Sequence, residues 1–193
     1  MTTIGRGVTH LEKVEAPGSM LSTAAAKALA VLRIATGFIF LWAFLDKTFG
    51  LGFATPAARA WILGGSPTKG FLSSVEVGPL QGLFHSIAGN PVLDWLFMLG
   101  LLGIGVALIA GIGLRISAIA TTVMMAGMWL AEFPLDKTTA AGEPSMSTNP
   151  IVDYHVVYAL VAIVAALAYA GHTWGLGRRW AQLPVVQANR WLI

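Results

Sequence analysis

Four long apolar runs, separated by charged breaks, constrain this chain more than any other feature of its sequence. Leu96 to Leu114 holds 19 residues without a charge, close to the roughly 20 that a helix needs to cross a hydrocarbon core about 30 Å thick. Ala28 to Leu45 carries one charge, and Ile116 to Ala131 carries none. Ile151 to Ala170 includes one carboxylate and one histidine. We therefore expect an all-α integral membrane protein, a four-transmembrane-helix bundle with spans at about 27–48, 92–114, 115–133 and 150–172.

The composition supports one membrane domain. Charged residues make up 11% of the chain and apolar residues 56%, against roughly 25% and 45–50% in ordinary globular proteins. The first twenty residues are polar and lack an apolar stretch, so we expect a flexible tail rather than a cleavable secretion signal. The expected division is an N-terminal tail at 1–23, a membrane domain at 24–175 and a C-terminal tail at 176–193. The chain has no cysteine, which excludes a disulfide framework and a thiolate metal site.

The positive charges predict the orientation, because Lys and Arg near span ends stay on the cytoplasmic side. One set of loops and tails holds seven basic residues: Arg6, Lys13, Lys27, Arg115, Arg178, Arg179 and Arg190. The other set holds most of the acids. We therefore expect a cell-membrane (inner or plasma membrane) protein with both termini in the cytoplasm. Anionic lipid explains the basic residues, so no nucleic-acid partner is expected.

The outer connections are long and should form a cap over the bundle, at about residues 50–90. Prolines at Pro56 and Pro79 favour short extracytoplasmic helices near 56–63 and 79–88, with a turn at 64–67 between them. Inside the bundle, Gly103, Ala107 and Gly111 predict a stripe of small residues for close helix contact.

Charged groups at membrane depth need a partner or a route to water. Arg33 has two interpretations: a snorkelling side chain, or an internal cation paired with an acid, a lipid phosphate or a cofactor. At the outer ends of three spans, titratable groups reach one level, among them Lys47, Glu132 and His155. Asp153 should point about 200° away from His155 on a helix, and therefore should not orient that histidine. Its alternative role is to satisfy the helix dipole near the start of a helix at Asn149-Pro150.

Several segments together resemble the DoxX/DoxD family of small four-helix membrane proteins. Leu32-Arg33-Ile34-Ala35-Thr36-Gly37 followed by Lys47 is similar to that family's first span. Gly65-Ser66-Pro67-Thr68-Lys69-Gly70-Phe71-Leu72 resembles its outer-loop signature. Gly100 to Arg115 resembles its glycine-rich second span, and Asn149-Pro150 with Asp153 and His155 the start of its fourth. The resemblance covers roughly residues 28–175.

In that family, DoxD is the large subunit of a thiosulfate:quinone oxidoreductase, which also has a separate small subunit. The enzyme passes electrons from thiosulfate to quinone and yields tetrathionate. The resemblance therefore implies a membrane subunit of a quinone-linked oxidoreductase, oxidising thiosulfate or another small anionic sulfur compound at the outer face. A small subunit or another redox protein would be its partner, besides membrane lipid, and homo-oligomers stay open. The alternative is a non-catalytic anchor or assembly subunit. A transporter is disfavoured because no inverted repeat is visible.

The residues can be assigned to this chemistry by type. A dianionic substrate needs cations on the water side, and the candidates are Lys47, Arg59, Lys69 and His85. A quinone needs an apolar slot with aromatic walls, for which the candidates are Trp42, Trp129, Tyr154 and Tyr158, with Arg33 as a further cofactor contact. Trp42, Trp129 and Tyr154 also fit an interfacial aromatic belt. The expected catalytic groups that handle protons are His155, Glu132 and Asp153. No metal or haem is expected.

Overall fold

The computed structural model describes residues 21–145, 147 and 149–193, and the elements in this part are all helices. Three are long and apolar enough to cross a membrane: α2 (Thr23–Phe49), α5 (Pro91–Ala110) and α6 (Leu114–Glu132). The described part of the chain is therefore all-helical, and three of the four expected spans are helices that could cross a membrane. The helix at the place of the fourth expected span, α7 (Tyr154–Leu167), is apolar but has 14 residues. At 1.5 Å per residue it is about 21 Å long, so a fourth span stays a prediction.

Local capping explains where the long helices begin and end. The Asn90 side chain accepts hydrogen bonds from the backbone N–H groups of Val92 and Leu93, and Pro91 occupies the first position of α5. Gly111 then ends α5 in a left-handed conformation. A short turn at 111–113 leads into α6, in agreement with the adjoining bounds expected for the spans at 92–114 and 115–133. The N-terminal tail expected at 1–23 lies mostly outside the described residues.

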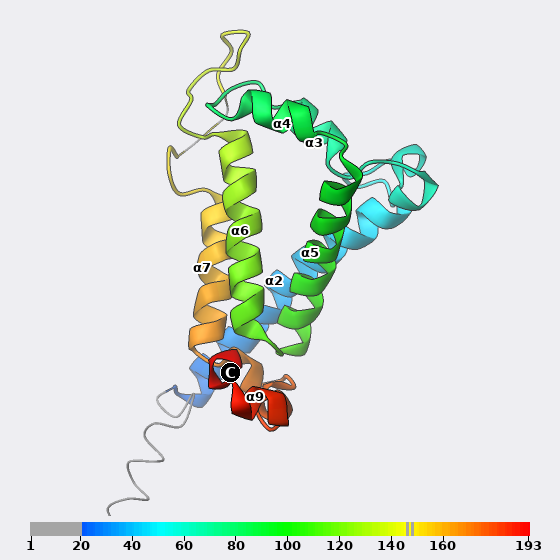
Figure 1. The fold of residues 1–193 in the computed structure, drawn as a ribbon. Coiled ribbons are helices and arrows are strands. Elements are labelled where there is room, and N and C mark those ends of the chain that lie inside the picture. The colour runs from blue at the N-terminus through cyan, green and yellow to red at the C-terminus, as the bar shows by residue number, and fades with distance from the viewer. Residues whose placement is uncertain (1–20, 146, 148) are drawn as a thin grey trace, which may run out of the picture.

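The helices pack as two pairs, α2 with α5 and α6 with α7, and the pairs diverge toward one end (Figure 1). A Cβ built on Gly105 would lie 2.7 Å from the backbone nitrogen of Leu41, and one on Gly37 would lie 2.9 Å from the backbone of Ile109. These two glycines therefore let α2 and α5 approach closely. The predicted stripe through Gly103 was wrong about the face, because a Cβ at Gly103 would meet nothing within 4 Å.

The cap spans the open end of the divergent pairs (Figure 1). It consists of η1 (Ala57–Arg59), η2 (Trp61–Leu63), α3 (Lys69–Ser73) and α4 (Gln81–Ile87). The helix predicted near 79–88 is confirmed as α4. The one predicted near 56–63 is two separate 3₁₀ turns, because Ala60 takes an extended conformation between them.

Two buried carboxylates hold the cap loops to the long helices. Asp46 accepts hydrogen bonds from the backbone N–H groups of Phe53 and Ala54, at 3.2 and 3.0 Å. Asp94 accepts from the Thr68 hydroxyl at 2.6 Å and from the Ser66 hydroxyl at 3.0 Å. The segment from Gly65 to Leu72 is thereby fixed against the start of α5.

The opposite end of the bundle is closed by the C-terminal segment, beside the start of α2 (Figure 1). It forms η3 (Ala170–His172), α8 (Gly177–Trp180), α9 (Pro184–Ala188) and η4 (Arg190–Leu192). Val186 is fully buried, and the Trp180 indole donates a hydrogen bond to the Leu192 carbonyl at 2.8 Å. This predicted tail is therefore folded against the bundle.

At this end of the bundle, Arg33 of α2 links the end of α5 to the segment that follows η3. Its fully buried guanidinium donates hydrogen bonds to the carbonyls of Leu108 and Ile109 near the end of α5, and of Thr173 and Trp174 after η3. The carbonyls in the last turn of a helix lack partners within that helix. Arg33 caps α5 from the side. Its partners in the structure are backbone carbonyls, and not the head groups, acid, lipid phosphate or cofactor that the sequence suggested.

Candidate functional site

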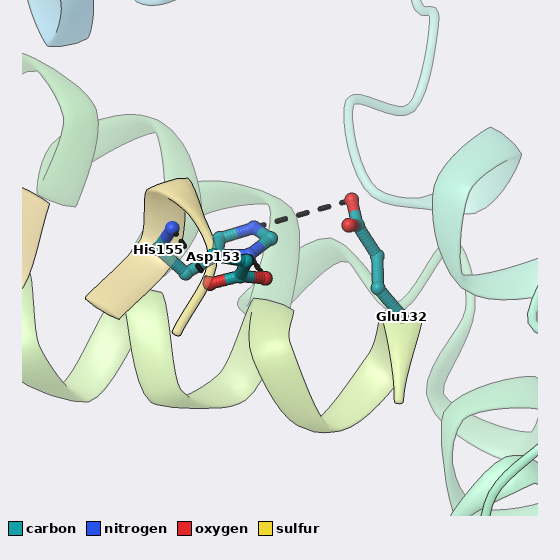
Figure 2. Close-up of side chains that lie close together, drawn as sticks. All are labelled: Glu132, Asp153 and His155. Atoms are coloured by element: carbon teal, nitrogen blue, oxygen red, sulfur yellow. Dashed lines mark hydrogen bonds and ion pairs between the residues drawn. The ribbon is translucent and has the colours of Figure 1, made fainter. Parts of the chain in front are cut away.

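Glu132, Asp153 and His155 converge at the cap end of the α6–α7 pair, and we call them the acid–histidine cluster (Figure 2). Glu132 is the last residue of α6, Asp153 is the N-cap of α7, and His155 is the second residue of α7. One donor atom from each lies within 4.8 Å of the others. The His155 side chain is fully buried, whereas the Glu132 side chain is 38% exposed.

Asp153 does orient His155, which corrects the expectation from the helical wheel. Asp153 Oδ2 lies 2.8 Å from Nδ1 of the ring, while Asp153 Oδ1 accepts the backbone N–H groups of His155 and Val156. The wheel failed because Asp153 lies outside the helix, with φ −112° and ψ −169°. A capping residue turns its side chain back over the first turn. The proposed capping role is confirmed at the same time, although α7 begins at Tyr154 and not at Asn149-Pro150.

The Asp153 carboxylate is held in its charged form. Partial burial opposes the charge, but the hydrogen bonds from the His155 ring and from the backbone of Val156 outweigh it, so the pKa lies below its usual value. A charged Asp153 accepts a hydrogen bond from Nδ1–H. The other ring nitrogen, Nε2, therefore faces Glu132 Oε1 across 4.0 Å.

Aromatic side chains surround the cluster on the α7 side. The Tyr154 hydroxyl donates a hydrogen bond to Glu132 Oε1 at 2.7 Å, and its ring lies over His155 with centroids 4.0 Å apart. Tyr158 packs edge-on against both Tyr154 and Phe40. The Trp129 indole donates to the Ile151 carbonyl at 3.0 Å, which fixes the loop before α7.

A cavity of about 520 Å³ adjoins the cluster beneath the loop that follows α6, and we call it the cap cavity. Glu132, Asp153 and Tyr154 line it, together with Glu76 and Ser145. Its described lining residues include three carboxylates and no Lys or Arg. The cluster therefore faces a space with a strongly negative lining.

A second cavity, of about 570 Å³, lies between α5 and α6 under α3 and α4, and we call it the lateral cavity. Among the described residues, its lining is almost entirely apolar, and Lys47 is the one charged residue in it. The Lys47 ammonium lies 6.0 Å from the centre of the Phe97 ring. Within the described part of the chain, it has no hydrogen bond or ion pair. Phe71 lines both cavities and so forms a wall between them.

The other predicted site residues are dispersed. Arg59 and Lys69 are exposed and line neither cavity, and the His85 ring bonds the Val75 carbonyl at 2.8 Å. Trp42, on α2, packs against Phe38 of the same helix and against Phe53 of the loop that follows it. Like Arg33, Trp129 and Tyr158, it lines neither cavity. The structure therefore divides the expected site into two: Lys47 in one cavity, and the cluster with Tyr154 beside the other.

Sequence reasoning overlooked Phe71, Gly100 and Gly127, which shape the lateral cavity. The signal for Phe71 was its place in the outer-loop segment from Gly65 to Leu72. A glycine in the middle of an apolar helix carries no signal for a cavity, because it is equally typical of close packing.

Comparison with protein-family models found no match for the chain, and comparisons with curated proteins and with solved structures found none either. Membership of the DoxX/DoxD family stays a prediction.

Proposed function

We propose that the protein is the membrane subunit of a quinone-linked oxidoreductase, and that the quinone ring binds in the lateral cavity beside Lys47. The observation that carries this proposal is a lone lysine ammonium, without a partner among the described residues, in the wall of an otherwise apolar cavity. A charge in such surroundings is costly unless a ligand or water satisfies it.

The size and the opening of the lateral cavity support this ligand. Its volume of about 570 Å³ lies within the range of small-molecule pockets. Leu96 and Val123 line it and are 63% and 68% exposed on the outer apolar surface. In a bilayer that surface faces lipid, so an apolar ligand reaches the cavity from the membrane without crossing water.

Lys47 has the chemistry that quinone reduction needs. Its ammonium donates a charge-assisted hydrogen bond to a quinone carbonyl oxygen, and the bond strengthens as that oxygen gains negative charge. The quinone takes up two electrons and two protons to become a quinol. With thiosulfate as the donor, two thiosulfate ions each lose one electron and join as tetrathionate. We propose that a partner protein passes these electrons, since no cysteine is available in the chain.

The charge distribution supports an orientation for this reaction. The end opposite the cap holds the start of α2, the start of α6 and the C-terminal segment (Figure 1). Arg115 belongs to the first turn of α6, and Arg178, Arg179 and Arg190 belong to the C-terminal segment. We propose that this end is cytoplasmic. Lys47 and the two cavities then lie toward the outer face.

Quinone binding to the purified protein in lipid nanodiscs tests the proposal. Lys47→Met keeps the length of the side chain and removes its charge. A hydrogen bond to a charged group is worth about 1.5–3 kcal/mol, so we expect the Kd for a short-chain quinone to rise at least about tenfold. Lys137→Met, which removes an exposed charge at the same end, is the matched control. Wild-type binding at micromolar quinone with an unchanged Kd in Lys47→Met would refute the role of Lys47.

The alternative, a non-catalytic anchor, has one observation in its favour. Lys47 lines the lateral cavity, but the other expected cations line neither cavity: Arg59, Lys69 and His85. The cations expected to bind a dianionic donor are therefore not gathered around Lys47. Thiosulfate-dependent quinone reduction, measured with candidate redox partners, separates the two. If the protein is an enzyme subunit, Lys47→Met reduces turnover. If it is an anchor, the wild type and Lys47→Met support assembly of the partner equally well.

A further inference from the structure

We infer that Glu132 and His155 bind a divalent metal ion of the zinc class at the edge of the cap cavity. This site is separate from the lateral cavity, and it does not depend on the proposal for quinone. It rests on an unpartnered buried nitrogen, two supporting hydrogen bonds and the charge of the cavity lining.

His155 Nε2 is prepared to act as a ligand. The side chain is fully buried, and Nε2 has no hydrogen-bond partner among the residues that the structure describes. Because Nδ1 bonds Asp153, the Nε2 lone pair points toward Glu132 (Figure 2). Histidine ligands of metals almost always give their other ring N–H to a carboxylate or carbonyl, which fixes the tautomer and strengthens the ligand. Asp153 has this supporting role.

Glu132 offers the second ligand with a matching support. Tyr154 donates a hydrogen bond to Glu132 Oε1, as ligating carboxylates are usually hydrogen-bonded in turn, while Oε2 has no hydrogen bond within the described part of the chain. Two ligands about 2.0–2.1 Å from a tetrahedral ion lie about 3.4 Å apart. Oε1 and Nε2 are 4.0 Å apart, so the half-exposed Glu132 side chain needs to move by only about 0.6 Å.

The surroundings favour a cation over a proton shared by the two groups. Glu76, Glu132 and Asp153 all line the cap cavity, whose described lining includes no Lys or Arg. Imidazole and carboxylate together suit zinc and related divalent ions. The cavity leaves the remaining coordination positions open to water or to a small anionic ligand, which is the arrangement of an open metal site.

The test is metal binding to the purified protein in detergent after treatment with EDTA. We expect a single Zn²⁺ to bind per chain by calorimetry, and Co²⁺ to give a visible absorption band from mixed nitrogen and oxygen ligation. His155→Gln and Glu132→Gln should each abolish the band. Asp153→Asn should weaken Zn²⁺ binding by about 10–100-fold, because it disturbs the orientation of His155.

Glu76→Gln is the matched control, since it removes a carboxylate from the same cavity without touching the cluster. It should leave the Co²⁺ band unchanged. Circular dichroism verifies that each variant is folded, and Glu132→Gln, at a 38% exposed side chain, provides the answer if His155→Gln does not fold. The inference is overturned if the wild type binds no Zn²⁺ or Co²⁺ at micromolar concentrations, or if binding persists in the variants without His155 and Glu132.

Discussion

Filling the lateral cavity with Gly127→Leu is the sharpest test of where the quinone binds. Gly127 lies within α6 and lines this cavity, and a Cβ built there would meet nothing within 4 Å. The Cβ of a leucine therefore has room beside the helix, and the rest of the side chain extends from a residue that lines the cavity. Its side chain occupies the volume that we assign to the ring.

Gly127→Leu should leave the stability of the fold unchanged or raise it, and should lower the affinity for quinone. Glycine in a helix interior is about 0.8–1.0 kcal/mol less favourable than alanine, and leucine is close to alanine. The variant should therefore unfold at the same temperature as the wild type or higher. Ring and leucine cannot share one volume, so the quinone Kd should rise at least tenfold, about 1.4 kcal/mol.

Equilibrium binding of a short-chain quinone in nanodiscs, together with thermal unfolding, measures both quantities. Gly103→Leu is the matched control. Gly103 is also a helical glycine, on α5, and a Cβ built on it would meet nothing within 4 Å, but Gly103 does not line the cavity. If Gly127→Leu is folded and binds quinone like the wild type, the lateral cavity is not the quinone site. Equal loss of binding in both variants would point to a general effect of added leucine.

Three further predictions concern the packing and the closed end of the bundle. Gly105→Leu should destabilise the protein by about 3 kcal/mol or more, because its Cβ would enter the backbone of α2, whereas Gly103→Leu should not; urea unfolding in detergent measures the difference. Arg33→Met should cost at least about 2 kcal/mol, because the buried Leu108 carbonyl and three partly buried carbonyls lose their donor. A rise in proteolysis after residue 167 would report the release of the C-terminal segment. Burial, and then the nearby Arg178, lower the pKa of His172 below its usual value. Its neutral form therefore stabilises the fold fully above about pH 6.5, and this contribution falls as the pH drops toward the lowered pKa. His172→Gln should flatten the loss of thermal stability between pH 7 and pH 5, and an unchanged slope would contradict this account.

The long helices were predictable because hydrophobic length determines them. Spans expected at 27–48, 92–114 and 115–133 became helices at Thr23–Phe49, Pro91–Ala110 and Leu114–Glu132. The start of α7 was not predictable in this way, because Asn149 and Asp153 are both good capping residues and hydropathy does not distinguish between them. Asn149 accepts hydrogen bonds from the backbone of Ile151 and Val152 in a turn, and the helix begins only after Asp153.

The site was partly predictable by residue type and poorly by geometry. Polar residues at span ends pointed to Glu132, His155 and Lys47, but not to their division between two cavities. The helical wheel treated Asp153 as helical, so it missed the contact with His155. Likewise, the spacing of small residues on one helix could not show which face meets α2, because that depends on the partner helix and its Gly37.

The contacts of Arg33 impose an order on the making of this protein. Its carbonyl partners lie 75–76 and 140–141 positions later in the chain. A ribosome therefore releases the first apolar helix, with its guanidinium still without these acceptors, long before residues 173 and 174 exist. Assembly is complete only when the last segment has been synthesised, because a nascent chain that stops before residue 173 leaves the guanidinium with the Leu108 and Ile109 carbonyls and without its other two acceptors.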